Sequence, residues 1–94
     1  MTDMPEIPPE RSLIEYPCDF PIKVMGVQVD GFEQAIVSVA SRFDPGFDSG
    51  TVQRRPSRSG NYLGLTITIR ATSREQLDEL YRTLSTHPMV KIVL

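Results

Sequence analysis

The residues that decide the fold run Gly60-Asn61-Tyr62-Leu63-Gly64-Leu65-Thr66-Ile67-Thr68-Ile69-Arg70-Ala71, continue through Ser73-Arg74-Glu75-Gln76-Leu77, and end in Val90-Lys91-Ile92-Val93-Leu94. Apolar side chains alternate with other types from residue 62 to 71, which predicts a strand with one buried face. Ser73 can cap a following helix, with Gln76 at the capping-box position. His87-Pro88 ends that helix, and Met89 to Leu94 form a last strand.

The first half of the chain repeats this alternation of strand and helix. Phe20 to Gly26 alternates at period two and predicts a half-buried strand that ends at Gly26. Asp30 is the expected cap of a helix over residues 31–43, with Glu33 three residues on. Thr51 to Ser57 is a weaker strand, which Pro56 restricts to a sheet edge.

The predicted order is strand, helix, strand, strand, helix, strand. This order is typical of the ferredoxin-like βαββαβ plan, an α+β fold. We expect a four-stranded antiparallel sheet in the order 4-1-3-2, with both helices on one face. Residues 13–94 form this single domain, and residues 1–12 are expected to be a flexible, acidic, proline-rich tail.

Composition excludes several classes of function. The formal charge is −2, with five acids and one base in residues 1–19 and nine bases against seven acids in residues 20–94. Such a near-neutral domain lacks the basic footprint of a dedicated nucleic-acid clamp. No apolar run spans a membrane, no signal peptide is evident, and the single cysteine forms no internal disulfide. Together these features predict a cytoplasmic protein.

Two separated motifs resemble the YbeD-like family of bacterial proteins. The first runs from Tyr16 to Gly26 and contains Lys23-Val24-Met25-Gly26; the second begins at Ser59-Gly60-Asn61-Tyr62 and includes Glu75-Gln76-Leu77 and the final Val93-Leu94. The resemblance covers about residues 13–94 and departs from the family at Ser12 and Cys18. It implies a ferredoxin-like fold similar to the ACT regulatory domain. It also implies an accessory role in lipoate metabolism, because some members are encoded beside lipoate-attachment genes.

No catalytic motif is present, so the sequence predicts a protein that is not an enzyme and carries no cofactor or metal. The single histidine, His87, lies at the end of a predicted helix without convergent partners. Cys18 lies between Pro17 and Asp19, where a nearby carboxylate disfavours the reactive thiolate.

Two surfaces remain as candidate binding sites. By similarity to ACT domains, the turn with Gly26, Gln28, Asp30 and Gly31 is a candidate site for a small ligand. The sheet face without helices is a candidate partner-binding face. Its expected members are Lys23, Met25, Tyr62, Thr68, Arg70 and Lys91, together with Thr66, Met89 and Val93. A homodimer through this face or through the edge of the last strand is also predicted.

The main prediction is a non-enzymatic regulatory or adaptor module that binds a small metabolite or a partner protein. The alternative is binding of single-stranded RNA through Arg54, Arg55 and Arg58 on the hairpin, with Tyr62 nearby. The same arginines could equally keep an edge strand soluble.

Overall fold

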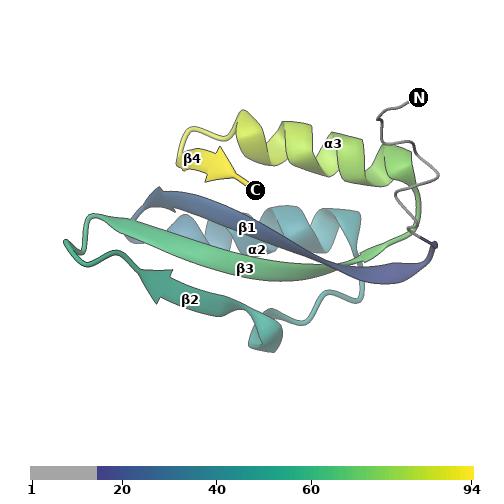
Figure 1. The fold of residues 1–94 in the computed structure, drawn as a ribbon, viewed down its shortest axis with the longest axis horizontal. Helices are drawn as coiled ribbons and strands as arrows, with labels where there is room; N and C mark the ends of the chain where they lie inside the picture. Colours follow the sequence, from purple (N-terminus) through teal and green to yellow (C-terminus); the bar gives the residue numbers. More distant parts are fainter. Residues whose placement is uncertain (1–14) are drawn as a thin grey trace, which may run out of the picture.

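The computed structural model describes residues 15–94, and the predicted tail over residues 1–12 lies outside them. Its elements follow the predicted order (Figure 1). They are β1 (Cys18–Val27), α2 (Phe32–Phe43), the short 3-10 helix η1 (Ser49–Thr51), β2 (Gln53–Pro56), β3 (Tyr62–Ala71), α3 (Arg74–Ser85) and β4 (Val90–Val93). Cys18 therefore begins β1 rather than preceding it, and Gly26 lies inside this strand rather than at its end.

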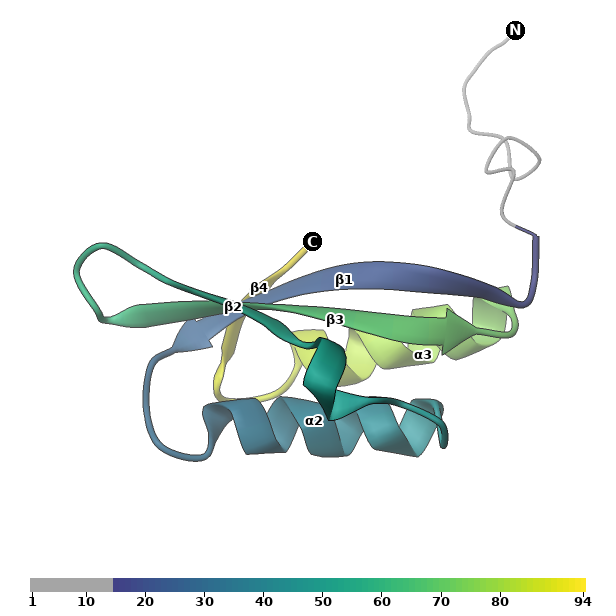
Figure 2. The same cartoon turned by 90° about the horizontal axis from the view of Figure 1, so that it is seen from below.

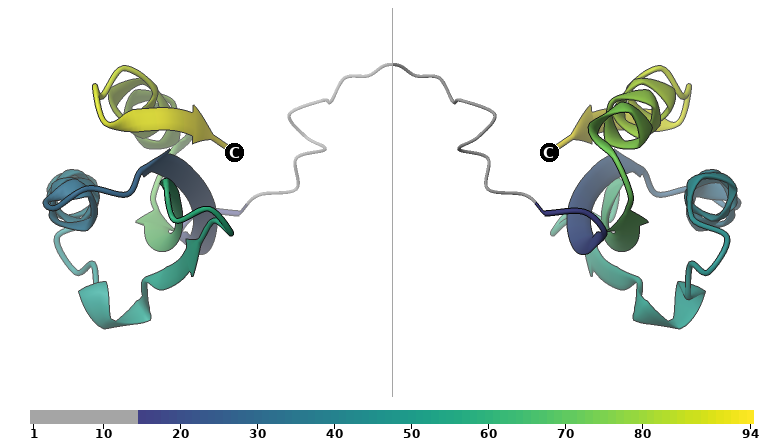
Figure 3. Two further views of the ribbon diagram at one scale, coloured as in Figure 1. Left: turned by 90° about the vertical axis from the view of Figure 1, so that its left-hand side faces the viewer. Right: turned by 90° about the vertical axis from the view of Figure 1, so that its right-hand side faces the viewer.

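The four strands form one antiparallel sheet in the order β2-β3-β1-β4, as the sequence predicts. Both helices cover the same side of this sheet, and the opposite side carries no helix of the described residues (Figures 2 and 3). We call this opposite side the open face. The ferredoxin-like prediction is confirmed, and Pro56 lies on the edge strand β2.

The core fills the space between the sheet and the helices. It follows from the alternation of the two long central strands, β1 and β3, which pair from Cys18 opposite Ala71 to Val27 opposite Tyr62. The inward positions of these strands pack against the apolar stripes of α2 and α3. The largest fully buried side chains are Phe32, Ile22, Ile36, Leu65, Ile67, Ile69, Leu80, Leu84 and Val24.

The two helices begin differently, and only one begins as predicted. Ser73 caps α3 by accepting a hydrogen bond from the N–H of Gln76. Asp30 does not cap α2, because the N-cap is Gly31, which makes no side-chain cap and has φ 90°. A left-handed residue is readily supplied only by glycine. The capping-box carboxylate of Glu33 is instead bound to Arg54 on β2.

Gln76 joins the end of α2 to the junction between β3 and α3. Its amide oxygen accepts from the N–H of Thr72 (2.7 Å), and its amide nitrogen donates to the carbonyls of Phe43 (2.8 Å) and Arg70 (3.2 Å). One side chain thus links the end of α2, the end of β3 and the start of α3.

A β-bulge determines which side chains β4 presents to the open face. Met25 pairs with Ile92, but Gly26 pairs with Val90, so the register shifts by one residue between them. Met89, Val90 and Val93 pack against the core. The prediction that Met89 and Val93 lie on the open face is therefore wrong, because an unbroken alternation does not anticipate the bulge.

Candidate functional site

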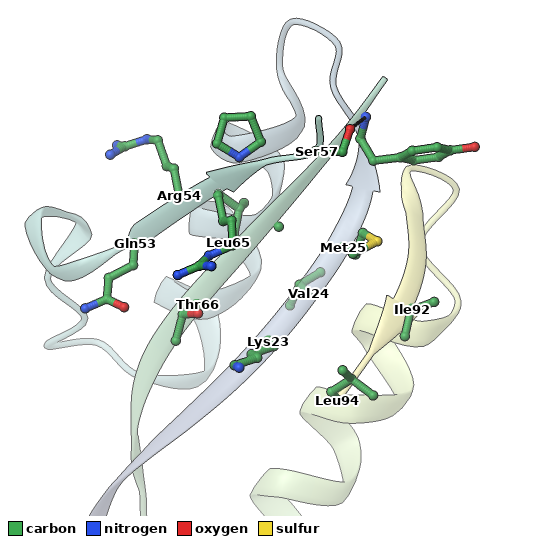
Figure 4. Close-up of a pocket in the computed structure, with 14 residues that line it drawn as sticks. Lys23, Val24, Met25, Gln53, Arg54, Ser57, Leu65, Thr66, Ile92 and Leu94 are labelled. Carbon is green, nitrogen blue, oxygen red and sulfur yellow. Dashed lines mark hydrogen bonds between the residues drawn. The ribbon is translucent and has the colours of Figure 1, made fainter. Parts of the chain in front are cut away.

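A shallow hollow of about 630 Å³ lies on the open face and draws residues from all four strands (Figure 4). It is lined by Lys23, Val24, Met25, Gln53, Arg54, Arg55, Pro56, Ser57, Tyr62, Gly64, Leu65, Thr66, Ile92 and Leu94. Leu94 joins β4 to this surface by exchanging two backbone hydrogen bonds with Lys23, at 2.8 and 3.2 Å.

The sheet register arranges the open-face side chains in two rows. One row runs from Gln53 through Thr66 and Lys23 to Leu94. The next row runs Arg55, Gly64, Met25 and Ile92. Residues directly opposite each other in adjacent strands share a face. Gly64 therefore leaves a gap without a side chain between Arg55 and Met25.

Neither backbone conformation nor packing requires a glycine at position 64. Its φ is not positive, unlike those of Gly31 and Gly60. A Cβ atom added there would meet only the backbone oxygen of Arg55, at the ordinary contact distance of 3.5 Å. A glycine inside a strand often marks a place where a ligand or another chain approaches closely. Gly64 was not among the predicted site residues, although its position in the middle of a strand was a usable signal.

Four large apolar side chains around the hollow are exposed to solvent. The exposed fractions are 41% for Met25, 43% for Tyr62, 50% for Ile92 and 72% for Leu94. They belong to β1, β3 and the β4 end, so the fold brings together residues that are distant in the sequence. Ile92 and Leu94 were not predicted here, because their placement depends on the bulge.

The charged side chains that line the hollow are all basic, and one of them is already paired. Arg54 lies opposite the buried Leu65, so its side chain belongs to the helix side of the sheet. Its Nε and Nη2 donate to the two carboxylate oxygens of Glu33, both at 2.5 Å. These hydrogen bonds and the charge of Glu33 raise the pKa of Arg54 above its ordinary value. Figure 4 shows this side chain directed away from β1.

The structure does not gather the predicted RNA-binding arginines into one cluster. Successive strand residues point to opposite faces, so Arg54 and Arg55 diverge. Arg58 lies in the exposed turn between β2 and β3. Only Arg55 and Tyr62 of the predicted nucleic-acid residues remain on the open face.

Of the nine residues predicted for the partner-binding face, Met89 and Val93 pack against the core, and Thr66 lines the hollow. The other six are split among three places. Lys23, Met25 and Tyr62 line the hollow. Thr68 and Arg70 line a second, smaller depression with Asp19, Asp44 and Asp48. There Arg70 contacts Asp19 at 3.5 Å, and its backbone N–H donates to Asp44 at 3.0 Å. Lys91 is exposed at the β4 bulge and lines neither.

The turn predicted for a small ligand lies at the far end of β1, and its residues play different roles. Gly26 is buried, and a Cβ there would lie 2.5 Å from a ring carbon of Phe32 and closer still to the carbonyl oxygen of Met89. This glycine is required by packing. Gln28 and Asp30 are exposed, and the N–H of Gln28 donates to the carbonyl of Asn61 at 2.9 Å.

The other described residues that could act in catalysis or metal binding are dispersed. His87 accepts a hydrogen bond from the N–H of Met89 through Nδ1 at 3.1 Å, which orders the turn before β4. Among residues 15–94, no three His, Cys, Asp or Glu side chains are close enough to hold a metal ion. Neither helix of the described residues has the length and apolarity to cross a membrane.

Comparisons with known proteins identify relatives over nearly the whole chain. Residues 11–94 match the family described as "Protein of unknown function (DUF493)". A UPF0250 protein of Leptothrix cholodnii is 68% identical over 91 residues, which cover 97% of this chain and 100% of the relative. A UPF0250 protein of Bordetella pertussis is 67% identical over 91 residues, with the same coverage.

A solved structure supports the fold. The solution structure of protein HP0495 from H. pylori matches with a TM-score of 0.74 and 15% identity, covering 100% of this chain and 98% of that one. At this identity the likeness shows the fold alone. The predicted family resemblance is confirmed by the sequence matches, and the chain belongs to the DUF493 family of bacterial proteins of unknown function.

Proposed function

We propose that this chain is a small regulatory or adaptor module, without catalytic activity of its own, that binds a partner protein through the hollow of the open face. The observation that carries the proposal is the exposed apolar lining of the hollow: Met25 and Tyr62 lie beside the side-chain gap at Gly64, and Ile92 and Leu94 continue this surface at the end of β4. Contiguous exposed apolar surface in a small domain marks an interaction site far more often than scattered apolar residues do.

The shape of the hollow favours a protein over a small metabolite. Small-molecule sites bury most of the ligand in a concave cleft with apolar walls. Here the lining comes from the strands of one sheet and the segments beside them, with neither helix contributing a wall. The turn that an ACT-like ligand would occupy has less support, because the ring of Phe32 already occupies the space at Gly26.

The RNA alternative also has less support. Sheet faces that bind single-stranded RNA stack bases on aromatic side chains of the central strands. Tyr62 is the only aromatic residue that lines the hollow, and Arg54 is engaged with Glu33. The accessory role in lipoate metabolism remains a prediction from the family resemblance.

Site-specific photo-crosslinking tests the proposal. A photoreactive phenylalanine analogue is placed at position 25, inside the hollow, or at position 29 as a matched control. Val29 is 51% exposed against 41% for Met25, and it lies outside the hollow. The full-length chain is then irradiated in bacterial extract, and the crosslinked species are identified by mass spectrometry.

We expect one dominant adduct with another protein at position 25 and none of that mass at position 29. Equal adducts at both positions, no adduct at position 25, or an adduct only with a second copy of the chain would each contradict the proposal.

A further inference from the structure

We infer that the hollow receives an extended, acidic peptide segment of its partner, with an apolar side chain over Gly64 and a carboxylate on each side of it. This inference rests on the proposed function of the hollow and names the chemistry of the partner. It follows from the charges of the lining residues and from their spacing on the sheet.

The charged side chains that line the hollow are all positive. None of the fourteen lining side chains is acidic. No ion pair between described residues includes Lys23 or Arg55, whereas Arg54 is paired with Glu33. Two such cations with apolar side chains beside them are complementary to a segment that is apolar and acidic, because opposite charges across an interface favour encounter and set its register.

The spacing of the two cations defines the spacing of the carboxylates. Lys23 lies on β1 and Arg55 on β2, with β3 between these two strands. Along the strand direction the two positions are offset by two residues. With about 4.8 Å between strands and about 3.3 Å per residue, their Cα atoms are about 12 Å apart. In an extended peptide, residues i and i+4 are about 13 Å apart and on the same side, with residue i+2 between them. The matching pattern is carboxylate, any residue, apolar residue, any residue, carboxylate.

The side chain of residue i+2 would face β3, which lies between the two cations in the sheet order. Gly64 and Thr66 are the β3 residues at this place, and Gly64 supplies the gap that an apolar side chain needs. Met25 and Tyr62 then provide apolar contact beside it.

The same charges argue against a second copy as the occupant. A symmetric dimer centred on the hollow would pair this patch with itself. Lys23 and Arg55 would then face the same cations of the other copy, which is unfavourable when both are desolvated.

The test is a titration of the isotope-labelled full chain with two blocked heptapeptides, followed by amide chemical shifts. The first probe is acetyl-Gly-Glu-Ser-Leu-Ser-Glu-Gly-amide, and the second replaces both glutamates with lysine. We expect saturable shifts at Lys23, Met25, Gly64 and Thr66 with the acidic probe and none with the basic probe.

Variants with matched charge sharpen the test. Lys23→Glu combined with Arg55→Glu should weaken binding of the acidic probe at least tenfold. The control combines Arg42→Glu with Arg58→Glu, which changes the net charge equally outside the hollow and should bind as the parent does.

Each remaining outcome overturns the inference. Equal shifts with both probes would show non-specific contact, and shifts confined to other residues would place the site elsewhere. If the acidic probe fails while position 25 still crosslinks to a protein, the partner chemistry is wrong and the proposed function stands. If both experiments fail, the proposed function fails as well.

Discussion

Replacement of Gly64 by valine is expected to stabilise the fold while removing partner binding. A glycine inside a strand costs roughly 0.5–1 kcal/mol relative to alanine, because its unfolded chain has more freedom to lose. A β-branched residue gains further on a scale that spans about 1 kcal/mol. The added Cβ meets only the Arg55 backbone oxygen, at the ordinary contact distance of 3.5 Å, so this atom brings no steric cost against the gain. The expected net stabilisation is about 1 kcal/mol, or a Tm increase of about 4–8 °C for a domain of this size.

Gly26 is the matched comparison, because it lies on the neighbouring strand and is required by packing. Gly26→Ala would place a methyl group 2.5 Å from the ring of Phe32 and into the carbonyl oxygen of Met89. Overpacking of this kind costs about 1–3 kcal/mol or more. The two glycine substitutions should therefore change stability in opposite directions.

Urea denaturation of the two variants and the parent checks both expectations, with equal m-values indicating that each chain unfolds from the same compact state. A Gly64→Val variant that is less stable than the parent by about 1 kcal/mol or more would show instead that the fold requires this glycine.

Three further predictions concern the framework that supports the open face. Gln76→Glu removes the amide donor to the Phe43 carbonyl and puts a charge beside it, so we expect the free energy of unfolding, measured by urea denaturation, to fall by about 1–3 kcal/mol. The same substitution at an exposed glutamine should lower it much less. Ser73→Ala should cost about 1 kcal/mol, whereas Asp30→Ala should cost nearly nothing because it caps no helix; equal losses would contradict the assigned caps. Burial raises the pKa of Tyr81 above its ordinary value of 10.0, so the neutral phenol stabilises the fold below pH 10, and this stabilisation is lost as the pH rises through the pKa of the folded state. The loss of stability at alkaline pH should therefore be smaller in Tyr81→Phe, and a dependence of stability on pH equal to that of the parent would contradict this.

The fold was predictable because its two central strands and two helices carry strong periodic patterns. The alternation from Tyr62 to Ala71 gave β3 its observed bounds, and Ser73 gave the start of α3. The rule that proline avoids ladder positions placed the strand with Pro56 at the sheet edge. Each of these signals is local, and the core then follows from the side to which the apolar residues point.

The candidate site was only partly predictable, because it depends on relations between strands. Because of the bulge between Met25 and Gly26, the open face carries Ile92 and Leu94 in place of the predicted Met89 and Val93. The local sequence contains no signal for this change of register.

The pairing of side chains between different helices and strands was also not predictable from the sequence. Glu33 fits a capping box, but its carboxylate is held by Arg54 of β2, which lies twenty-one residues away in the sequence. This contact removes one arginine from the predicted RNA-binding group. The difference in role between Gly26 and Gly64 likewise becomes visible only when the neighbouring side chains are placed.

The most direct test of the account is photo-crosslinking from position 25 in a chain that also carries Gly64→Leu. The leucine should fill the gap in the hollow without unfolding the domain, so we expect the partner adduct to disappear while the melting temperature is unchanged or higher. An adduct of undiminished yield from this folded variant would contradict the account, because the partner would then not need the space above Gly64.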